Sequence, residues 1–389
     1  MFSVNRFSEL LKLLPRGVFD RSVEQHQADR YRKHCSTWQQ MVAMLYGQLS
    51  GASSLRVLER GFNAHTSHHY HLGCRSVRRS SLAEMNARTP ERVFEEVAHT
   101  LMQQMHGRLR REGEEFLRLL DSTSLTLKGE GFDAWTSHNR TRNTQGLKVH
   151  VLLAGTHSIP LAQQISAPNV NDVEYARGLS IEPAVTYVFD KAYCDYSWWW
   201  RLQCSNARFV TRFKCNAKLA SLKQRAIPKA AQHIVLSDEL VRFANKHPGA
   251  GRKNPYVLPI RRIKVAREGK PPLVLATNDL KSSAMKIAEA YRSRWQIELF
   301  FKWMKQHLRI KSFLGRSERA VRTQVLTALI TYLLVALYAK IHQTKQSLWL
   351  LLSELRSALF QRSDTEHLRH RRWRERKAEF HDRQTTLFT

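Results

Sequence analysis

The chain has few cysteines, and it lacks both a disulfide pattern and a long hydrophobic run. Its 389 residues include 5 cysteines, an odd number with no Cys-x-x-Cys pair, which argues against a disulfide framework and favours a reducing cytoplasm. The most apolar segment, Val325 to Ala339, is shorter than the roughly 18 residues of a transmembrane helix, so we expect a buried helix there. Glu9 and Lys12 interrupt the leucine-rich N-terminus, and we expect no signal peptide.

Acidic residues are also scarce. The 33 Asp and Glu side chains face 63 Lys and Arg, which gives a net charge of +30. Such a surface attracts polyanions, and nucleic acid is the partner that we expect. An anionic membrane surface is the alternative, but we find no amphipathic anchor helix of the usual kind. The sequence contains no GxxxxGK, HExxH or GxSxG motif, so nothing indicates nucleotide hydrolysis, zinc proteolysis or serine-hydrolase chemistry.

The first 110 residues have the pattern of a helical region. Thr37 is a candidate cap for a helix that ends near Ser50, and a second helix follows from Leu55. The pair is either a helix-turn-helix or an ordinary αα-hairpin. A cluster of histidines and one cysteine follows, and these residue types suggest a zinc site. Their spacing fits no familiar zinc finger, so we favour a polar loop near DNA. The cluster consists of His65, His68, His69, His71 and Cys74.

The pattern changes from helical to strand-rich after Glu114. The chain then alternates strands with short helices, which predicts an α/β core with a mixed sheet. We expect strands over 116–127, 146–153, 159–165 and 185–189, and helices over 172–179 and 195–204. An antiparallel β insertion with one basic face should follow, with strands over 208–213, 233–243, 256–267 and 272–277. A single long helix over 282–307, a helical segment over 318–358 and a basic tail over 368–377 complete the chain.

The predicted long helix places four polar residues on one narrow face. Tyr291, Arg294, Glu298 and Lys305 are spaced so that they share this face, beside an apolar stripe that must pack on a core. An Arg294–Glu298 pair at i,i+4 is a common surface device, and this is the plain interpretation. A carboxylate on a mostly buried helix, however, needs a partner or a catalytic role.

Two aspartates lie on predicted strands of the core. Asp121 lies within the first strand, and Asp190 ends the apolar strand over 185–189. Either residue alone could be a turn residue or a helix cap. If their strands are neighbours and the helix packs on that sheet, both carboxylates converge with Glu298. Mg²⁺ would relieve their mutual repulsion, and two such ions suit phosphoryl transfer.

These residues resemble a known family. The pattern Tyr291-x2-Arg294-x3-Glu298-x6-Lys305 resembles the YREK signature of bacterial insertion-sequence transposases with a DDE triad, and the surrounding YRSRWQIELFFKWMKQHLRIKSF is typical of that branch. LLDSTSL around Asp121 and VFDKAYCDY around Asp190 resemble the two aspartate motifs of the family. In the second motif Ala192 replaces the usual glycine. The resemblance covers nearly the whole chain.

The resemblance implies a ribonuclease H-like mixed-sheet core, interrupted by the antiparallel β insertion and flanked by helical N-terminal and C-terminal regions. Five parts follow from it. They are a helical DNA-binding domain over 1–110, the first part of the catalytic core over 111–204, the insertion over 205–280, the second part of the core with the Glu298 helix over 281–316, and a C-terminal helical region with the basic tail over 317–389.

The resemblance also implies an activity. Asp121, Asp190 and Glu298 would hold two Mg²⁺ ions, for which Mn²⁺ can substitute, and Tyr291, Arg294 and Lys305 would contact DNA phosphates. The enzyme would cut its element at the terminal inverted repeats and join the free 3′-hydroxyls to target DNA, as a homodimer on double-stranded DNA in the bacterial nucleoid.

Two alternative activities and the role of the tryptophans also have to be considered. A metal-dependent nuclease on the same fold and a domesticated, non-catalytic DNA-binding protein remain the alternatives to a transposase. In some members of the family a Trp in the insertion helps to hold a flipped base. Residues 205 to 290 contain no Trp, and Trp198, Trp199 and Trp200 fit a helix core better than base stacking.

Overall fold

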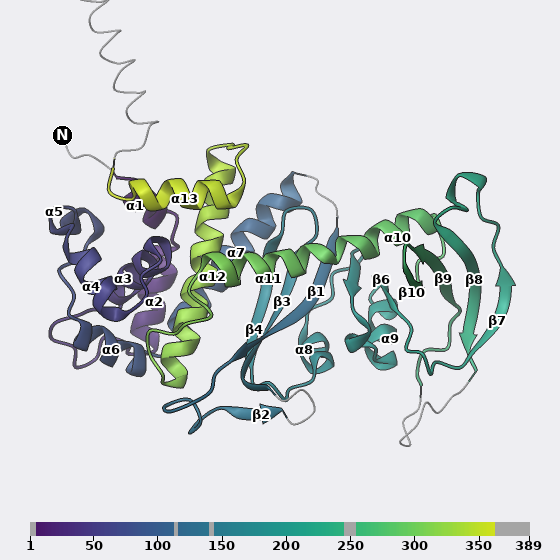
Figure 1. Cartoon of the computed structure of the whole chain (residues 1–389), viewed down its shortest axis with the longest axis horizontal. Coiled ribbons are helices and arrows are strands. Elements are labelled where there is room, and N and C mark those ends of the chain that lie inside the picture. The colour runs from purple at the N-terminus through teal and green to yellow at the C-terminus, as the bar shows by residue number, and fades with distance from the viewer. Residues whose placement is uncertain (1–4, 113–115, 140–143, 245–253, 362–389) are drawn as a thin grey trace, which may run out of the picture. The chain divides into compact units, whose positions relative to one another are not determined.

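The computed structural model describes residues 5–112, 116–139, 144–244 and 254–361. The chain forms two compact units, one of Met1–Leu101 with Gln306–Thr389 and the other of Met102–Lys305. The first unit is helical and the second contains the sheet (Figure 1). The predicted basic tail lies outside the described residues.

The helical unit is built around one long apolar helix, α12 (Glu318–Ile341). By length and composition α12 could cross a membrane, but 78% of its most apolar window is buried inside the protein. It packs against α3, α6 and α13 of the same unit, which confirms the prediction of a buried helix. The other helices are α1 (Arg6–Lys12), α2 (Arg16–Gln25), α3 (Thr37–Ser50), α4 (Leu55–Asn63), α5 (Thr66–His69), η1 (Tyr70–Leu72), α6 (Arg79–Arg88), the first part of α7 (Arg92–Arg111) and α13 (Leu348–Ala358).

The start of α3 corrects one detail of the sequence prediction. The helix cap is Ser36, not Thr37, because a capping box joins Ser36 and Gln39. Helix α3 is almost wholly buried and is capped at its C-terminus by Gly51, which has a positive φ. The outward face of α4, in contrast, carries the exposed Arg56 and Arg60. Whether this pair of helices binds DNA as a helix-turn-helix stays a prediction.

The histidine cluster packs within the helical unit. His69 is buried, stacks on the Phe62 ring at 4.3 Å and lies 3.0 Å from the Phe62 carbonyl oxygen. His65 and His68 both stack on Phe360, at 4.0 and 5.3 Å between ring centroids. In the part of the chain that the structure describes, no three His, Cys, Asp or Glu residues form a metal-ion site. Nothing in the structure therefore supports a zinc site at this cluster.

A mixed sheet forms the core of the second unit. Strand β1 (Leu117–Thr126) pairs antiparallel with β3 (Thr144–Ala154), and β3 pairs antiparallel with β4 (Ile159–Ser166). On its other side β1 pairs parallel with β5 (Thr186–Phe189), which pairs parallel with β6 (Arg208–Arg212). This arrangement agrees with the mixed sheet of the ribonuclease H-like core that the resemblance implies. The short β2 (Ser137–Asn139), which periodicity did not predict, pairs with β3.

The sheet continues into the segment after residue 205. Strand β10 (Lys270–Thr277) pairs antiparallel with β6, and β9 (Ile260–Arg267), β8 (Val235–Phe243) and β7 (Leu219–Gln224) follow, all antiparallel. The structure differs from the predicted insertion at β6, which is a parallel neighbour of β5. It also adds β7, a mostly exposed edge strand whose sequence, LASLKQ, has no alternation of apolar and polar residues.

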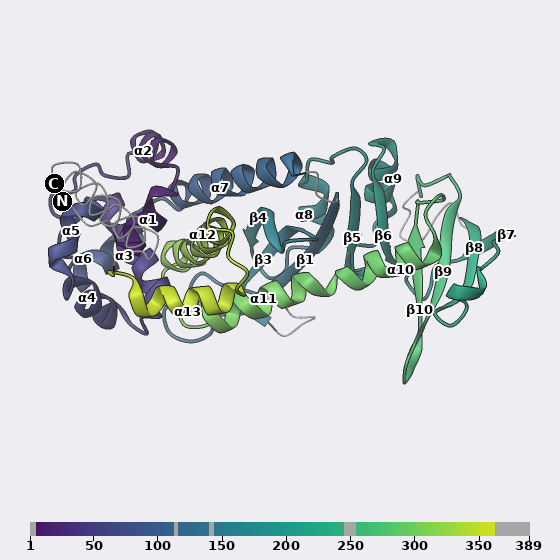
Figure 2. The ribbon, with the colours of Figure 1, turned by 90° about the horizontal axis from the view of Figure 1, so that it is seen from above.

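Helices cover the two faces of this sheet (Figure 2). Helices α8 (Asp172–Gly178) and α9 (Tyr196–Cys204) lie on one face, where Trp198 and Trp199 are buried in the hydrophobic core, as predicted. Helices α10 (Ala284–Ser293) and α11 (Trp295–His307) run along the opposite face. Because side chains alternate along a strand, each strand sends its residues alternately to these two helix layers.

Candidate active site

The register of two parallel strands brings two aspartates together. Leu120 of β1 lies opposite Phe189 of β5, so Asp121 and Asp190, the next residues of the two strands, lie at the same level. Leu120 and Phe189 belong to the core on the α8–α9 side, which turns both aspartates toward the face covered by α10 and α11. The structure therefore brings together two of the three predicted carboxylates by strand pairing alone.

The turn after Asp190 tolerates the departure from the family motif. Lys191–Tyr193 forms a short 3₁₀ turn, η2. Ala192 is not among the described residues with a positive φ, the conformation that a glycine would favour. Alanine at this position therefore needs no strained backbone.

The predicted single helix over 282–307 is two helices. Helix α10 ends at Ser293, and α11 begins at Trp295, with Arg294 in a turn between them. Ile297, Phe301 and Met304 of α11 are buried as the apolar stripe predicted, but Trp295 and Leu299 are 59% and 47% exposed. The break does not separate the four polar residues of the signature, because Arg294 keeps a helical backbone conformation.

Arg294 joins the helix pair to the first aspartate. Its Nη1 lies 3.3 Å from Asp121 Oδ2, and its Nη2 donates to Glu298 Oε1 at 2.5 Å. The Arg294 guanidinium carbon lies 5.9 Å from the centre of the buried Tyr291 ring. The predicted Arg294–Glu298 pair is therefore present, and it is tied to the sheet rather than confined to the helix surface.

Lys305 contacts the same strand further along. Its Nζ donates to the backbone carbonyl oxygen of Ser124 at 3.2 Å, three residues past Asp121 on β1. All four residues of the predicted signature thus lie along the side of β1 that faces α10 and α11. Their position is compatible with the predicted contacts to DNA phosphates, which remain a prediction.

The sequence did not predict one residue of the site. Arg212, the last residue of β6, donates from Nε at 3.1 Å and from Nη2 at 2.5 Å to Asp190 Oδ1. The sequence did hold a signal, because Arg212 ends a β-rich run parallel to the strand before Asp190, and neighbouring parallel strands end at the same edge. The pairing of β5 with β6 was needed to use this signal.

The two aspartates have pKa values shifted in opposite directions. Burial raises the pKa of Asp121 to about 6, against the opposing effects of the Ser122 backbone N–H and of Arg294. Burial is the largest single effect on Asp190 and acts to raise its pKa. The hydrogen bonds from Arg212 and from the Lys191 backbone N–H, together with the charges of Arg212 and Arg294, outweigh it, so that the pKa lies below its ordinary value. Neighbouring carboxyl groups in environments this different are typical of functional sites.

Hard divalent cations prefer carboxylate oxygens as ligands. The carboxylates of Asp121, Asp190 and Glu298 are each partly exposed. As their side chains lie, no three of the described His, Cys, Asp and Glu residues are close enough to hold a metal ion. A guanidinium stands at each carboxylate instead: Arg294 at Asp121 and Glu298, and Arg212 at Asp190. The donor set therefore fits a divalent metal only if these cations are displaced.

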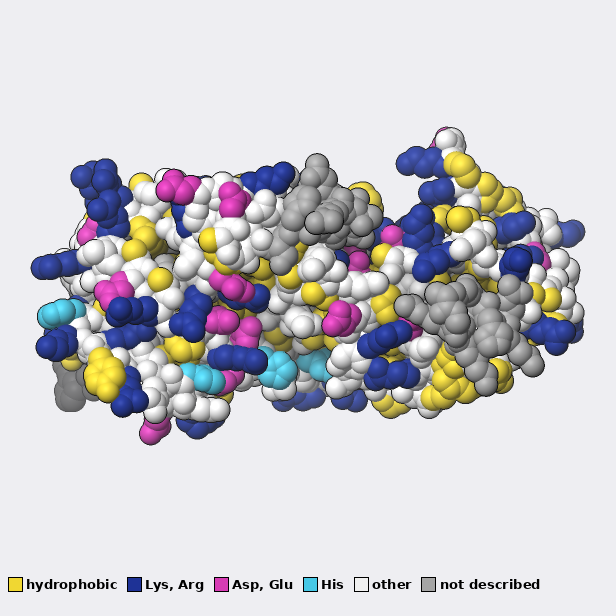
Figure 3. All heavy atoms as spheres, turned by 90° about the horizontal axis from the view of Figure 1, so that it is seen from below, with side chains coloured by type: hydrophobic (Ala, Val, Ile, Leu, Met, Phe, Trp, Pro, Cys, Tyr) yellow, Lys and Arg dark blue, Asp and Glu magenta, His cyan; other side chains and the backbone are white. Residues whose placement is uncertain are grey.

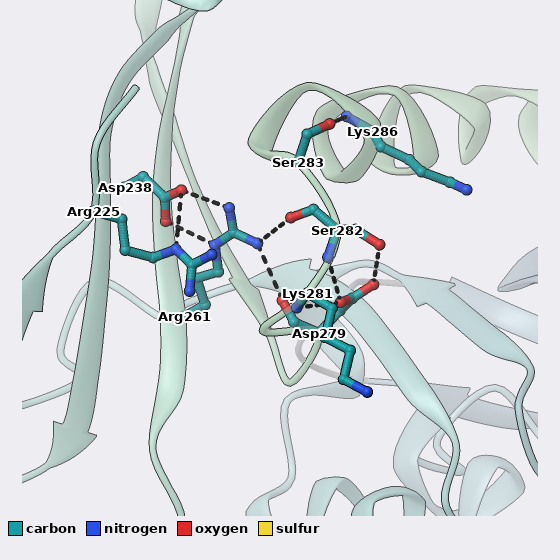
Figure 4. A network of polar contacts seen from close by, with 8 residues as sticks. All are labelled: Arg225, Asp238, Arg261, Asp279, Lys281, Ser282, Ser283 and Lys286. Carbon is teal, nitrogen blue, oxygen red and sulfur yellow. Dashed lines mark hydrogen bonds and ion pairs between the residues drawn. The ribbon is translucent and has the colours of Figure 1, made fainter. Parts of the chain in front are cut away.

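A buried network fixes the start of α10, which leads to the site (Figure 4). Arg261 of β9 makes a two-pronged ion pair with Asp238 of β8, at 2.7 and 2.5 Å. Its Nη1 also donates to the carbonyl oxygens of Asp279 and Ser282, just before the helix cap Ser283. Both charged side chains are almost fully buried. The β insertion thus anchors the helix that carries Tyr291.

Basic side chains are more numerous than acidic ones on the visible surface of the insertion. Figure 3 shows Lys and Arg in dark blue over the part of the view that holds β7 to β10, where few acidic side chains are visible. Arg242 and Lys264 are exposed on β8 and β9, and Lys223 is exposed on the edge strand β7. The strand register places Arg242 and Lys223 on one face of the sheet and Lys264 on the other, and Arg261 is buried, so the basic residues are not confined to the single face that the alternating sequence predicted. An excess of basic side chains fits a polyanionic partner.

Comparison with known proteins identifies the family. A family model described as the transposase DDE domain matches residues 113–334, and a model for a domain of unknown function matches residues 5–75. The putative transposase y4zB of Sinorhizobium fredii is 40% identical over 285 residues, which cover 73% of this chain and 78% of that protein. The probable transposase for insertion sequence element IS5377 of Geobacillus stearothermophilus is 28% identical over 220 residues, covering 56% of this chain and 55% of that protein.

This chain also resembles a solved structure. A cryo-EM structure of the piggyBac transposase synaptic complex with hairpin DNA matches with a TM-score of 0.46 and 11% identity, over 90% of this chain and 77% of that chain. The DDE-domain match spans more than half of this chain, and the likeness to y4zB is both high and extensive. The chain therefore belongs to the transposase DDE-domain family, and it is a DNA transposase whose activity depends on divalent metal ions.

Proposed function

We propose that this transposase belongs to the branch with the YREK signature, and that Asp121, Asp190 and Glu298 are its catalytic carboxylates. The observation that supports this most is the convergence of three distant segments. Strand pairing sets Asp121 beside Asp190, and Arg294 connects Asp121 to Glu298. Segments so far apart in the sequence meet on one face of the sheet only because of the fold.

Divalent ions, Mg²⁺ in the cell or Mn²⁺ in its place, would be held by these three carboxylates. When bound they supply Lewis-acid activation of the attacking oxygen and charge stabilisation of the leaving oxygen. The protein's own contribution is to hold the carboxylates on two strands and one helix, with Ser122 N–H fixing the Asp121 carboxylate at 2.8 Å. No nucleotide cofactor is required for this transfer.

The cations of the site would bind DNA phosphates next to the cut. Arg294 and Arg212 present planar guanidinium groups, which suit bidentate phosphate recognition. Lys305 adds a point charge along β1, and the Tyr291 hydroxyl can donate a further hydrogen bond. When Arg294 and Arg212 bind phosphate oxygens instead of the carboxylates, the carboxylates become available to bind metal. DNA binding and metal binding would then support each other.

A basic groove in the helical unit is the surface that we propose for binding the element ends. Two cavities of about 420 and 510 Å³ flank the segment from Arg32 to Cys35. Arg30, Lys33 and Arg75 line them, and Tyr31 and Tyr70 stand exposed at their borders. The two acidic residues of the lining are engaged, Asp29 by Thr37 and Glu84 by Arg88. Cations with exposed aromatics between them are typical of nucleic-acid surfaces.

The full proposed reaction is cut-and-paste transposition. The helical region over 1–110 binds the terminal inverted repeats, the core over 111–204 and 281–316 cleaves at each element end, and the free 3′-hydroxyls attack target DNA in line. The insertion over 205–280 and the C-terminal region over 317–389 support these steps. Two ends must be joined, so we propose a homodimer on double-stranded DNA, acting at the nucleoid of a bacterial cytoplasm.

The test uses a plasmid that carries the gene's own locus with its flanking DNA. Purified protein and Mg²⁺ should release a linear fragment cut at both flanks. Glu298→Gln should abolish release while keeping DNA binding, and the exposed Glu289→Gln, one helix earlier, should cut normally. Random nicking would instead support a nuclease, and binding without any metal-dependent cutting would support a non-catalytic DNA-binding protein. Either of those results would overturn the proposal.

A further inference from the structure

A buried polar cluster lies beneath the two aspartates, on the opposite face of the sheet. At its centre is Asp172, in the first turn of α8, which is 4% exposed. Ser122 Oγ donates to Asp172 Oδ1 at 2.6 Å, and Lys148 Nζ lies 3.1 Å from the same oxygen. His150 Nδ1 lies 3.6 Å from it. The proposed mechanism uses the backbone N–H of Ser122 but none of these four side chains.

The cluster touches the backbone at both aspartates. Ser122 faces α8 because Asp121 faces the helices on the other side. Tyr193, in the η2 turn after Asp190, is fully buried and lies close enough to Ser122, Asp172 and Asp121 to interact electrostatically. Its backbone N–H donates to the carbonyl oxygen of Asp190 at 3.0 Å. One buried group of side chains therefore contacts the residue after Asp121 and the turn after Asp190.

Such a cluster is costly to bury. An ion pair taken out of water is stabilising only where further hydrogen bonds satisfy its remaining donors and acceptors, and apolar side chains of similar size often serve stability as well. Lys148 makes one such further hydrogen bond, because its Nζ also donates to the Val170 carbonyl oxygen at 2.9 Å. His150 makes another, because its Nε2 lies 2.9 Å from Ser166 Oγ. The strands β1, β3 and β4 and the start of α8 are thereby joined at one point.

We propose that Asp172, paired with Lys148, is a positioning residue that fixes β1 at Asp121 through Ser122. This inference rests on the proposed catalytic role of Asp121. Asp172 does not touch DNA or metal. It restrains Ser122, whose own N–H holds Asp121 Oδ1, so that the carboxylate presents its second oxygen to the opposite face. Loosening Ser122 should therefore weaken metal binding without altering the DNA-binding surfaces.

A second buried ion pair on β1 provides a matched control. Arg118, three residues before Asp121, points to the same side as Ser122 and pairs with Glu182 at 3.2 Å. It ties β1 to a neighbouring loop, and its guanidinium bonds to Glu182, to His106 and to its own strand's backbone rather than to Ser122. A variant of Glu182 should thus lower the stability of the unit and leave the geometry at Asp121 unchanged.

The experiment measures Mn²⁺ binding to the metal-free protein by electron paramagnetic resonance, together with thermal unfolding. It compares wild type with Ser122→Ala, Asp172→Asn, Ser122→Thr and Glu182→Gln. We expect Ser122→Ala and Asp172→Asn to weaken Mn²⁺ binding about tenfold, which corresponds to roughly 1.4 kcal/mol. Ser122→Thr, which keeps the hydroxyl, should bind like wild type. Glu182→Gln should lose stability and keep its Mn²⁺ affinity.

The outcomes separate this inference from the proposed function. Wild-type Mn²⁺ affinity in Ser122→Ala, a mild change that the fold should accept, would overturn the inference, and so would an equal loss in Glu182→Gln. If Ser122→Ala weakens Mn²⁺ binding and the wild-type protein fails to cut its element ends, the positioning role stands and the proposed function fails. DNA-end binding in EDTA, unchanged in all four variants, confirms that the change is confined to the core.

Discussion

Asp121, within β1, and Asp190, directly after β5, lie at the same level of two neighbouring parallel strands, one residue past the Leu120–Phe189 pair. Each carboxylate is met by an arginine from a different element, Arg294 from the α10–α11 turn and Arg212 from the end of β6. The site without metal is therefore a set of paired charges. If these carboxylates bind metal as proposed, the ions would have to compete with two guanidinium groups for the same oxygens, and this competition would have measurable consequences.

Removing Arg294 should strengthen metal binding and yet weaken the reaction. In Arg294→Ala the carboxylates of Asp121 and Glu298 lose their shared counter-ion, so the Mn²⁺ dissociation constant without DNA should fall, by about tenfold for each 1.4 kcal/mol of competition removed. Cleavage should fall because the guanidinium no longer holds a DNA phosphate. Titration calorimetry measures the first effect, and Lys223→Ala on the exposed edge strand is the control. Weaker Mn²⁺ binding in Arg294→Ala would show that the guanidinium is no competitor.

Asp121 should make the stability of the metal-free protein depend on pH. Its pKa is raised from 3.8 to about 6 in the folded state, so the folded protein holds a proton that the unfolded chain has lost between those values. Stability contributed by this group therefore falls as the pH rises through that window, by at most about 3 kcal/mol. Asp121→Asn removes the titration, and its melting temperature in EDTA should exceed that of wild type at pH 8 and approach it at pH 5. A difference of the opposite sign at pH 8 would contradict the shift.

The Arg261–Asp238 pair should be essential as a pair but replaceable as a unit. Arg261→Gln leaves the Asp238 carboxylate buried without its main partner, and such a loss costs roughly 3–5 kcal/mol. The carbonyl oxygens before α10 would also lose their donor. Limited proteolysis should detect earlier opening at the start of α10. The double variant Arg261→Met with Asp238→Leu should recover much of the stability, and equal destabilisation of the single and double variants would contradict this expectation.

The basic groove should govern binding of element ends. Replacing Arg32 and Lys33 by Ala removes two cations between its cavities, so end binding should weaken. The slope of log affinity against log salt should decrease by about 1 for each DNA phosphate that is no longer neutralised. Fluorescence anisotropy with a labelled end duplex measures both. Replacing the exposed Lys12 and Lys345, which line neither cavity, provides the charge-matched control. An unchanged salt slope in the groove variant would place end binding elsewhere.

The sequence predicted the parts of the site that depend on local patterns. The apolar run before Asp190 predicted its strand, and the spacing from Tyr291 to Lys305 predicted a shared helix face. The structure contains that strand, and the shared helix face survives the break at Arg294, because a single residue in a turn with helical dihedral angles keeps the helix phase. The element boundaries agree within a few residues wherever hydrophobic periodicity was strong.

What periodicity could not predict depends on pairing between distant segments. Arg212 was overlooked because only the parallel pairing of β6 with β5 brings it to Asp190. The edge strand β7 is mostly exposed, and its apolar residues Leu219, Ala220 and Leu222 do not alternate with polar ones, so it carries no strand pattern to detect. Asp172 looked like an ordinary residue at the start of a helix, and its burial beneath Ser122 follows from the tertiary fold.

A change of metal preference is the most direct test of the central claim, that Asp121, Asp190 and Glu298 bind the catalytic metal ions. Asp190→Cys replaces a carboxylate by a thiolate, a softer ligand that binds Mg²⁺ poorly and tolerates Mn²⁺. Single-turnover cleavage of a labelled element end should be lost in Mg²⁺ and partly recovered in Mn²⁺, while wild type cuts in both. Equal activity of Asp190→Cys and wild type in Mg²⁺ would contradict a role for this carboxylate in binding metal.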